Sequence, residues 1–369
     1  MTIQITDRKE SKGFLKGIRK CAAERRNPFS VMFELTYECN FDCIHCYVRG
    51  SRKEKRELNT KEVFSVLDEL KKMGIFRIGF TGGEPLLRKD IFDILDYANK
   101  CGFKKGLLTN GYLIDEKIAD SLKNLNIDKV EITLNALNAA IFDKMTRVKS
   151  SFEKVKHAVE LLVERGIQVK VKSTATSLNK NEPVKISQYA RALDIPYNLD
   201  CEIMPCRDGC EAAVNEYSLS GRETYEIRKK VYPEMFNGTR KKSKTKRRHD
   251  RMFNCGVGKN SFSITPYGEM NLCLEIDHPR YNILSKGAEA SWEAIKKKID
   301  ELNNISNFIC KDCDLLKYCG WCAGRSYIET GSFNKCSEYF KKRAIERREM
   351  DYEQKKDSKK KLQCCNKGN

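Results

Sequence analysis

Three cysteines and a short glycine-rich turn are the residues of this chain whose types and spacing could do chemistry. Cys39, Cys43 and Cys46 have a C-x3-C-x2-C spacing in the segment CNFDCIHC, and Gly82-Gly83-Glu84-Pro85 follows later in the chain. Three thiolates at this spacing can hold three corners of a [4Fe–4S] cube and leave the fourth iron open, whereas an electron-carrying ferredoxin closes all four with cysteine. An open iron can bind a substrate.

Tetrahedral zinc is the alternative interpretation of the three cysteines, because short Cys spacings also suit Zn²⁺. Structural zinc sites usually close with four ligands, and neither a fourth cysteine nor a second histidine lies near Cys46 in the sequence. His45 is the one nearby candidate, and it sits between two of the thiols. The spacing therefore favours an iron–sulfur cluster over zinc.

These motifs resemble those of the radical S-adenosylmethionine (SAM) superfamily. In that family the open iron chelates the amino and carboxylate groups of SAM, and reduction of the cluster releases a 5′-deoxyadenosyl radical, chemistry that belongs to the cofactor while the protein positions it. The resemblance implies that Cys39, Cys43 and Cys46 are the catalytic cluster ligands. It also implies that His45, in a slot that is usually aromatic, lies near the adenine.

The elements that must position these residues alternate between strands and helices. Runs rich in β-branched residues predict strands, and stretches such as 61–73 and 152–165 have the apolar periodicity of amphipathic helices. The predicted strands are 31–36, 76–80, 104–109, 129–134, 167–175 and 198–204. Six βα units predict a parallel sheet with helices outside. Because the pattern ends short of the roughly 250 residues of a complete barrel, we predict an α/β fold, a partial (β/α)6 TIM-like barrel of the kind that radical SAM enzymes have.

The cysteine triad follows the first predicted strand, which places it at the C-terminal rim where parallel sheets gather their ligands. After the second strand, Gly82 and Gly83 give a turn free of side chains, whose backbone groups could meet the methionyl ammonium of SAM, with Glu84 helping to hold the turn. The other predicted SAM-binding residues also follow strands: Asn110, Thr133, Asn135, Thr176 and Arg207.

Each of these later residues has a plainer alternative role. Thr133 and Asn135 stand where the family often has a Ser-x-Asp pair for the ribose, although Asn135 replaces the usual acid. Arg207 could approach the SAM carboxylate through a charge-assisted hydrogen bond, and a surface ion pair is its alternative. Turn formation alone would explain Asn110, and capping of a strand end would explain Thr176.

A second set of cysteines occupies the C-terminal third. Its members are Cys255, Cys273, Cys310, Cys313, Cys319, Cys322 and Cys336. The arrangement resembles the SPASM extension, which holds two auxiliary [4Fe–4S] clusters. The resemblance assigns Cys255, Cys273 and Cys322 to an inner cluster, and Cys310, Cys313, Cys319 and Cys336 to an outer one. Two residues rather than the family's usual three separate Cys319 from Cys322, and a four-cysteine zinc ribbon is the alternative.

The inner set has only three thiolates. Its fourth iron could be open, bind water or substrate, or take another cysteine such as Cys206 or Cys210, which follow the sixth strand. Beside Cys273, Asp277 is a candidate to accept a proton as a substrate radical is oxidised, and a plain polar loop is the alternative.

Five segments follow from these patterns. They are an N-terminal extension (1–29), the radical SAM partial barrel (30–210), a basic connecting segment (211–254), a small cysteine-rich iron–sulfur domain (255–340) and a basic tail (341–369).

Composition narrows the class of protein further. The 369-residue chain has seventeen cysteines, no apolar run of the roughly 18 residues that a membrane span needs and no signal peptide, so we predict a cytoplasmic metalloprotein. The net charge of +19 could attract nucleic acid, but the basic block at 240–251 has no aromatic residue between its charges for base stacking. An acidic partner, or simple solubility, explains the charge better.

The predicted function is that of a radical SAM/SPASM oxidoreductase that modifies a peptide or protein substrate by a crosslink, a thioether or another oxidative change. Only about thirty residues precede the first strand, so we expect a separate leader-binding protein, and a flavodoxin- or ferredoxin-type reductant. Maturation of a small cofactor, such as a heme or quinone precursor, is the alternative function. The non-enzymatic alternatives are an iron–sulfur electron carrier and a zinc-dependent nucleic-acid-binding protein.

Overall fold

The computed structural model describes residues 8–49, 56–236, 252–276, 278–305 and 308–365. Within them, one sheet has the strand order β6-β5-β4-β3-β2-β1-β7-β8-β9. The strands are β1 (Ser30–Thr36), β2 (Arg77–Gly82), β3 (Lys104–Thr109), β4 (Lys129–Thr133), β5 (Val169–Thr174), β6 (Tyr197–Asp200), β7 (Ser261–Ile264), β8 (Glu269–Asn271) and β9 (Tyr281–Asn282). All six predicted strands are present.

Strands β1 to β6 are parallel to their neighbours, which confirms the predicted partial α/β barrel. The sheet does not stop at the predicted end of the barrel. Strand β7 lies parallel to β1, with Ser30 opposite Ser261, and β8 and β9 follow as antiparallel strands. The first part of the cysteine-rich segment is therefore an extension of the barrel sheet.

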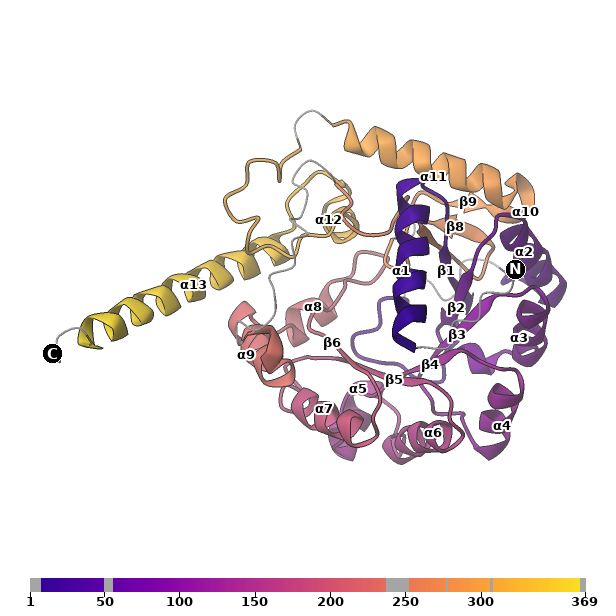
Figure 1. Cartoon of the computed structure of the whole chain (residues 1–369), viewed down its shortest axis with the longest axis horizontal. Coiled ribbons are helices and arrows are strands. Elements are labelled where there is room, and N and C mark those ends of the chain that lie inside the picture. The colour runs from indigo at the N-terminus through magenta and orange to yellow at the C-terminus, as the bar shows by residue number, and fades with distance from the viewer. Residues whose placement is uncertain (1–7, 50–55, 237–251, 277, 306–307, 366–369) are drawn as a thin grey trace.

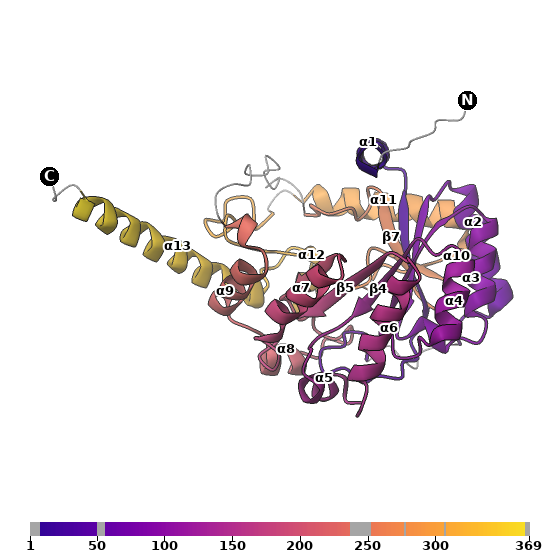
Figure 2. The ribbon, with the colours of Figure 1, turned by 60° about the horizontal axis from the view of Figure 1, so that its bottom comes forward.

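Helices surround the strands. They are α1 (Arg8–Glu24), α2 (Thr60–Lys72), α3 (Ile91–Lys100), α4 (Glu116–Asn124), α5 (Ala139–Thr146), α6 (Phe152–Glu164), α7 (Glu182–Ala192), α8 (Ala212–Tyr217), α9 (Gly221–Val231), α10 (Ile283–Lys286), α11 (Ala288–Asn303), α12 (Ala323–Thr330) and α13 (Glu338–Cys365). Figure 1 shows α2, α3, α4, α6 and α7 around the outside of the strands. Helix α13 begins beside α9 and then projects away from the body of the molecule (Figure 2).

Local sequence explains where these helices begin and which face they bury. Helix α2 starts after Asn59, whose side chain accepts a hydrogen bond from the Glu62 amide at 3.0 Å while the Glu62 carboxylate accepts one from the Asn59 amide at 2.8 Å. Its apolar residues recur at the spacing of one helix face and are buried against the sheet: Val63, Val66, Leu67 and Leu70. Burial of each such side chain contributes about 1.5–3 kcal/mol.

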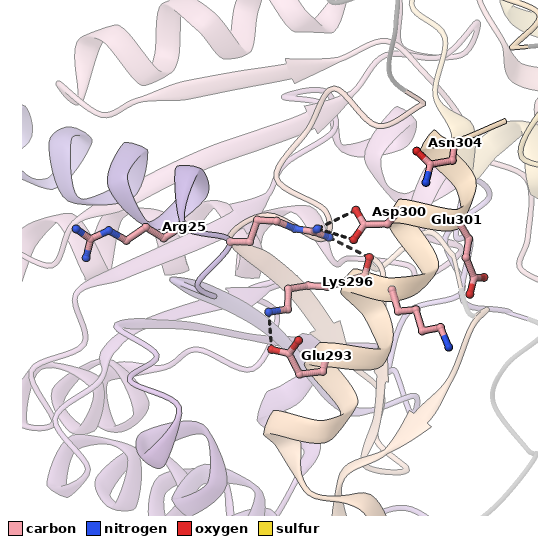
Figure 3. Close-up of a pocket in the computed structure, with 8 residues that line it drawn as sticks. Arg25, Glu293, Lys296, Asp300, Glu301 and Asn304 are labelled. Carbon is pink, nitrogen blue, oxygen red and sulfur yellow. Dashed lines mark hydrogen bonds and ion pairs between the residues drawn. The ribbon is translucent and has the colours of Figure 1, made fainter. Parts of the chain in front are cut away.

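The C-terminal end of α1 is fixed to α11 by ion pairs. Arg26, just after α1, donates two 2.8 Å hydrogen bonds to the Asp300 carboxylate and further bonds to the backbone of Gly258 and Lys296. Lys296 in turn pairs with Glu293 in the pocket that these residues line (Figure 3). The ion pair of Arg26 with Asp300 ties the N-terminal helix to the C-terminal third, and the pair of Lys296 with Glu293 lies within α11.

Part of the predicted basic connecting segment, residues 237–251, lies outside the described residues. Among the helices that the structure does describe, none combines the length and apolar composition that crossing a lipid bilayer requires.

Candidate active site

A cavity of 390 Å³ opens where the barrel strands end, and the cysteine triad lines it. The walls come from the loop after β1 and from the ends of β2 to β6. The predicted residues that line it are Cys39, His45, Cys43, Cys46, Gly82, Gly83, Asn110, Thr133 and Asn135. Residues 82, 110 and 135 lie far apart in the sequence, and the parallel strand ends bring them together.

The triad loop is held by backbone hydrogen bonds to helix α5. The amides of Asp42 and Ile44 donate to the carbonyls of Thr146 and Met145 at 3.1 and 2.9 Å. Burial raises the pKa of the Cys43 thiol, and the charges of Cys46 and Cys39 raise it further. Three half-buried thiols gathered in one loop suit a cationic partner, and the irons of a cluster would supply it.

The chemistry of this donor set therefore fits a [4Fe–4S] cluster. Among the described residues, no three His, Cys, Asp or Glu side chains converge closely enough to hold a single metal ion. The thiolates of a cube bind separate irons, so they have no need to converge on one point.

The glycine-rich turn packs directly against the backbone that leads to the triad. A Cβ atom on Gly83 would lie 2.2 Å from the Glu38 carbonyl oxygen, and one on Gly82 would lie 2.1 Å from that of Thr36. Gly82 also has a φ of +141°, which L side chains rarely adopt. The Gly83 amide uses this close approach to donate to the Thr36 carbonyl at 2.7 Å. Only glycine at both positions lets β2 end this near to the cysteine loop.

Glu84 fixes the same turn from below the cavity. Its side chain is fully buried and accepts hydrogen bonds from the Leu86 amide at 3.0 Å, the Thr109 hydroxyl at 2.8 Å and the Asn110 amide at 2.7 Å. It therefore joins the end of β2 to the end of β3. Burial raises the pKa of Glu84 to about 7, although these hydrogen bonds favour its ionised form.

We expect the Glu84→Gln variant to change how stability depends on pH. A carboxyl group whose pKa is raised in the folded protein favours folding at low pH, and that contribution is lost as pH rises from about 4.5 to about 7 at up to roughly 1.4 kcal/mol per pH unit. Glutamine cannot titrate, so this slope disappears. Denaturant unfolding of both proteins between pH 5 and 8 measures it, and parallel pH profiles would contradict the assignment.

His45 and Asn110 present polar atoms beside the triad. The His45 Nδ1 atom is buried without a hydrogen-bond partner, and burial lowers the pKa of its imidazole to about 4, so the ring is neutral near pH 7. An unpaired buried nitrogen in a cavity wall fits a purine that could complete its hydrogen bonding. Asn110 donates from Nδ2 to the Asn40 side chain at 2.7 Å, and this atom lies 3.9 Å from the Cys39 sulfur.

The predicted ribose contacts separate into two groups. Thr133 and Asn135 line the cavity, and Asn135 accepts a hydrogen bond from the Thr174 amide at 2.9 Å. Thr176 does not line it. Its side chain is completely buried, and its amide and hydroxyl both donate to the Asn179 side chain at 2.6 and 3.0 Å. Thr176 therefore caps the end of β5, the alternative role considered for it, and is removed from the SAM-binding set.

Arg207 also has a role other than the predicted one. Its side chain is 2% exposed, and it donates to the Glu34 carboxylate at 2.8 Å, to the Tyr37 hydroxyl at 2.5 Å and to the Leu274 carbonyl. Burial opposes its charge, but Glu34 and Tyr37 raise the pKa of Arg207 above its usual value. These partners occupy the guanidinium, so it ties β1 to the cysteine-rich segment and is not a ligand for the SAM carboxylate.

The Arg207→Gln variant is expected to lose stability, because it leaves the Glu34 carboxylate buried and unpaired. Loss of one partner of a buried ion pair costs about 3–5 kcal/mol. The control is Arg222→Gln, whose pair with Glu353 is exposed and contributes about 1 kcal/mol or less. Denaturant unfolding compares the two, and equal stabilities would contradict a structural role for Arg207.

The auxiliary cysteines lie in two groups. Burial raises the pKa of Cys322 to about 11, with contributions from Glu275 and Cys255, and Cys322 in turn raises the pKa of Cys273. Burial likewise raises the pKa of Cys310 to about 12, and its charged neighbours are Cys319, Cys313 and Cys336. The resemblance implies the same two sets, and the assignment of each set to a cluster stays a prediction. Each group gathers thiols of different exposure, from the buried Cys310 to the exposed Cys255 and Cys336, and such a set suits a cationic cluster.

Cys206 lies beside the first cluster site. Its thiol is 3.6 Å from the Cys46 carbonyl oxygen, and burial raises its pKa to about 11. Asp277 lies outside the described residues.

Three carboxylates lie in the cavity wall, and two of them, Asp200 and Glu202, were not predicted from the sequence. Asp200 ends β6, Glu202 follows it, and Glu275 comes two residues after Cys273. Burial raises the pKa of Glu275, the charges of Asp200 and Glu202 raise it further, and those of Arg325 and Arg207 lower it, so these groups lie in one electrostatic neighbourhood. The sequence does not show that these carboxylates lie close together, because Glu275 is far along the chain from Asp200 and Glu202. The only local indications are that Asp200 ends β6 and that Glu275 follows a cluster cysteine.

The fold and the triad together define an enzyme that binds SAM at an iron–sulfur cluster. Residues 33–187 match the model of the radical SAM superfamily, so this segment is a radical SAM domain, and the chain is an enzyme of the kind that uses a [4Fe–4S] cluster and SAM.

The known proteins that are similar to the chain differ from one another in their named activities. The AdoMet-dependent heme synthase of Methanosarcina barkeri is 24% identical over 331 residues, which cover 83% of this chain and 94% of that protein. The mycofactocin maturase MftC of Mycolicibacterium smegmatis is 33% identical over 156 residues, 42% of this chain and 40% of the relative. The similarity to the maturase therefore covers less than half of either protein.

Solved structures share the fold. Native anSMEcpe with bound AdoMet aligns with a TM-score of 0.67 at 20% identity, covering 91% of this chain and 100% of that chain. Streptococcus suis SuiB bound to the precursor peptide SuiA aligns with a TM-score of 0.64 at 15% identity, covering 90% and 81%.

Proposed function

We propose that this protein oxidatively modifies a peptide or protein substrate by radical SAM chemistry. Cys39, Cys43 and Cys46 would hold the catalytic cluster, which together with SAM supplies a 5′-deoxyadenosyl radical that can remove an unactivated hydrogen. Cys255, Cys273 and Cys322 would hold an inner auxiliary cluster, and Cys310, Cys313, Cys319 and Cys336 an outer one. Auxiliary clusters can accept the electron that an oxidised substrate gives up.

The residues of the chain would position SAM and exclude competing reactions. The turn at Gly82 and Gly83 brings backbone carbonyls near the cysteine loop, where they can accept hydrogen bonds from an ammonium group. His45 faces the purine, and Thr133 and Asn135 offer hydrogen bonds to the ribose. Glu84 keeps the ends of β2 and β3 together, so that these groups stay in register.

The observation that favours a peptide is the charge of the wall next to the triad. Asp200, Glu202 and Glu275 line the cavity, and its one lysine, Lys172, lies 3.8 Å from a fourth carboxylate, Glu131. A wall with three carboxylates and no free cation among its described lining residues repels anions. A peptide backbone or a basic side chain can enter such a site without this repulsion.

Maturation of a heme precursor is the second candidate, because the heme synthase similarity extends over most of both proteins. Heme and its precursors carry carboxylate side chains, which need cationic partners in a buried site. The acidic wall speaks against them.

Reaction of the reconstituted enzyme with each substrate class separates the two candidates. The peptide encoded by a small open reading frame next to the gene, with SAM and dithionite under anaerobic conditions, should lose hydrogen and gain a crosslink or thioether that tandem mass spectrometry locates. An iron tetrapyrrole should remain unchanged. Consumption of the tetrapyrrole with no change in the peptide would overturn the proposal.

A further inference from the structure

A second cavity, separate from the triad, lies between α9, residues 316–320 and the start of α13. It has a volume of 610 Å³, within the range of small-ligand sites. Cys319, one of the outer auxiliary cysteines, lines it. Glu202 lines both this cavity and the active-site cavity, so the two share a wall residue.

The second cavity has more cationic than anionic groups around it. Arg228, Lys317 and Arg347 line it, and Arg343 lies behind it, donating to the Leu219 carbonyl and the Thr224 hydroxyl at 2.7 Å each. Among the described residues, none of the three arginines forms an ion pair with a carboxylate. Burial lowers the pKa of Arg347, and the charges of Arg343 and Arg228 lower it further.

The guanidinium groups have unused hydrogen-bonding capacity. The Arg228 Nε atom is buried with no hydrogen-bond partner, and Arg347 donates only to the Tyr318 carbonyl, at 3.1 Å. The Glu202 carboxylate is in electrostatic range of both. A second lining carboxylate, Asp351, pairs with Lys317 at 3.7 Å. Glu202 is then the one carboxylate left for the three guanidinium groups, which leaves room for another anion, and guanidinium binds carboxylates with paired, charge-assisted hydrogen bonds.

The rest of the lining suits a side chain attached to a peptide. Tyr225, Phe236, Leu316 and Met350 give the cavity apolar surface beside the arginines. Because the two cavities share Glu202, they lie within a few residues of one another for an extended chain, at about 3.3–3.6 Å per residue. A folded acidic redox protein offers a broad convex face of about 800 Å², which does not enter a cavity of this size.

We propose that this second cavity binds an acidic side chain of the peptide substrate, with Arg228 and Arg347 as the groups that bind its carboxylate. The proposal rests on the proposed peptide substrate and adds a specificity rule to it. The modified segment is neutral or basic, and an Asp or Glu residue lies a few residues away from it.

Selection from a library tests the rule without knowledge of the natural substrate. Random peptides displayed on their encoding RNA are selected for binding to the reconstituted enzyme with SAM and without reductant. Three proteins are compared: wild type, the double variant Arg228→Gln/Arg347→Gln, and Arg348→Gln, a control on the same helix whose partner is the exposed Asp314. We expect wild type and the control to enrich peptides with Asp or Glu, and the double variant to lose that enrichment.

A selected peptide and its copy with Glu replaced by Gln then give the affinity difference. For wild type, we expect the Gln copy of the peptide to bind about 10- to 100-fold more weakly, as for loss of hydrogen bonds to a charged group, when affinity is measured by fluorescence anisotropy. For the double variant, we expect the two peptides to bind equally. Cleavage of SAM without substrate should be the same in all three proteins, so failure of this rule is distinct from failure of the radical chemistry. If the double variant does not fold, the affinities of the Glu peptide and its Gln copy are compared on wild type and on Arg347→Lys, and this comparison tests the proposal.

Three results would overturn the proposal. They are no acidic enrichment by wild type, the same enrichment by the double variant, and competition by inorganic phosphate as strong as that by the selected peptide. Loss of flavodoxin binding in the double variant, with peptide binding intact, would assign the cavity to the reductant instead.

Discussion

Replacement of Cys43 by alanine is expected to abolish formation of 5′-deoxyadenosine from SAM. Cys43 is the triad thiol whose pKa burial raises, and the charges of Cys46 and Cys39 raise that pKa further. Loss of a ligand leaves the cube with two thiolates, and we expect a larger effect than the roughly 10- to 100-fold that loss of an outer-shell partner causes. The measurement is 5′-deoxyadenosine by liquid chromatography after anaerobic reduction, together with iron per chain.

The control for this variant is Cys21→Ala, since Cys21 is exposed on α1 far from the cavity lining. It should keep both the iron content and the activity of wild type. Wild-type rates of 5′-deoxyadenosine formation in the Cys43→Ala variant would contradict the assigned ligand set.

Replacement of Gly83 by alanine should have the second largest effect. The new Cβ atom would lie 2.2 Å from the Glu38 carbonyl oxygen and 2.8 Å from that of Tyr37, and both are backbone atoms that cannot rotate away. Either the turn or the cysteine loop must move. A displacement of about 1 Å at a reactive site can cost about 10²-fold in rate, so we expect at least that loss in SAM cleavage, measured with SAM affinity by equilibrium dialysis.

Gly106→Ala is the matched control, because Gly106 lies within β3 and the nearest atom to its Cβ would be 3.8 Å away. This variant should fold and cleave SAM like wild type. If Gly83→Ala were as active as Gly106→Ala, the close contact between the turn and the triad loop would not be needed.

Much of the barrel is predictable because its strands and helices have strong local patterns. The strand predicted at 104–109 has the bounds of β3, and the helix predicted at 152–165 differs from α6 by one residue. Parallel strands bring their ends together by geometry alone, so residues such as Asn110 and Asn135 could be placed in one site before their contacts were known.

Contacts between distant segments have no such local signal. Strand β7 pairs with β1 across more than half of the chain, and nothing in the sequence of Ser261–Ile264 shows which edge it joins. Arg207 was predicted to bind SAM because it follows a strand, but its choice of Glu34 depends on a buried partner 173 residues away. Thr176 differs from Arg207, since its partner Asn179 is only three residues away and occupies both of its donors.

The central claim is that the Cys39, Cys43 and Cys46 thiolates leave one iron open for SAM, and electron paramagnetic resonance tests it most directly. Clusters held by the auxiliary cysteines would add overlapping signals to the spectrum. The measurement therefore uses a variant in which Cys310, Cys313 and Cys322 are all replaced by alanine, alongside wild type. After reduction with dithionite, addition of SAM should change the signal of the remaining cluster, and 5′-deoxyadenosine should form. An unchanged signal and no 5′-deoxyadenosine, with about four irons bound per chain, would contradict the account.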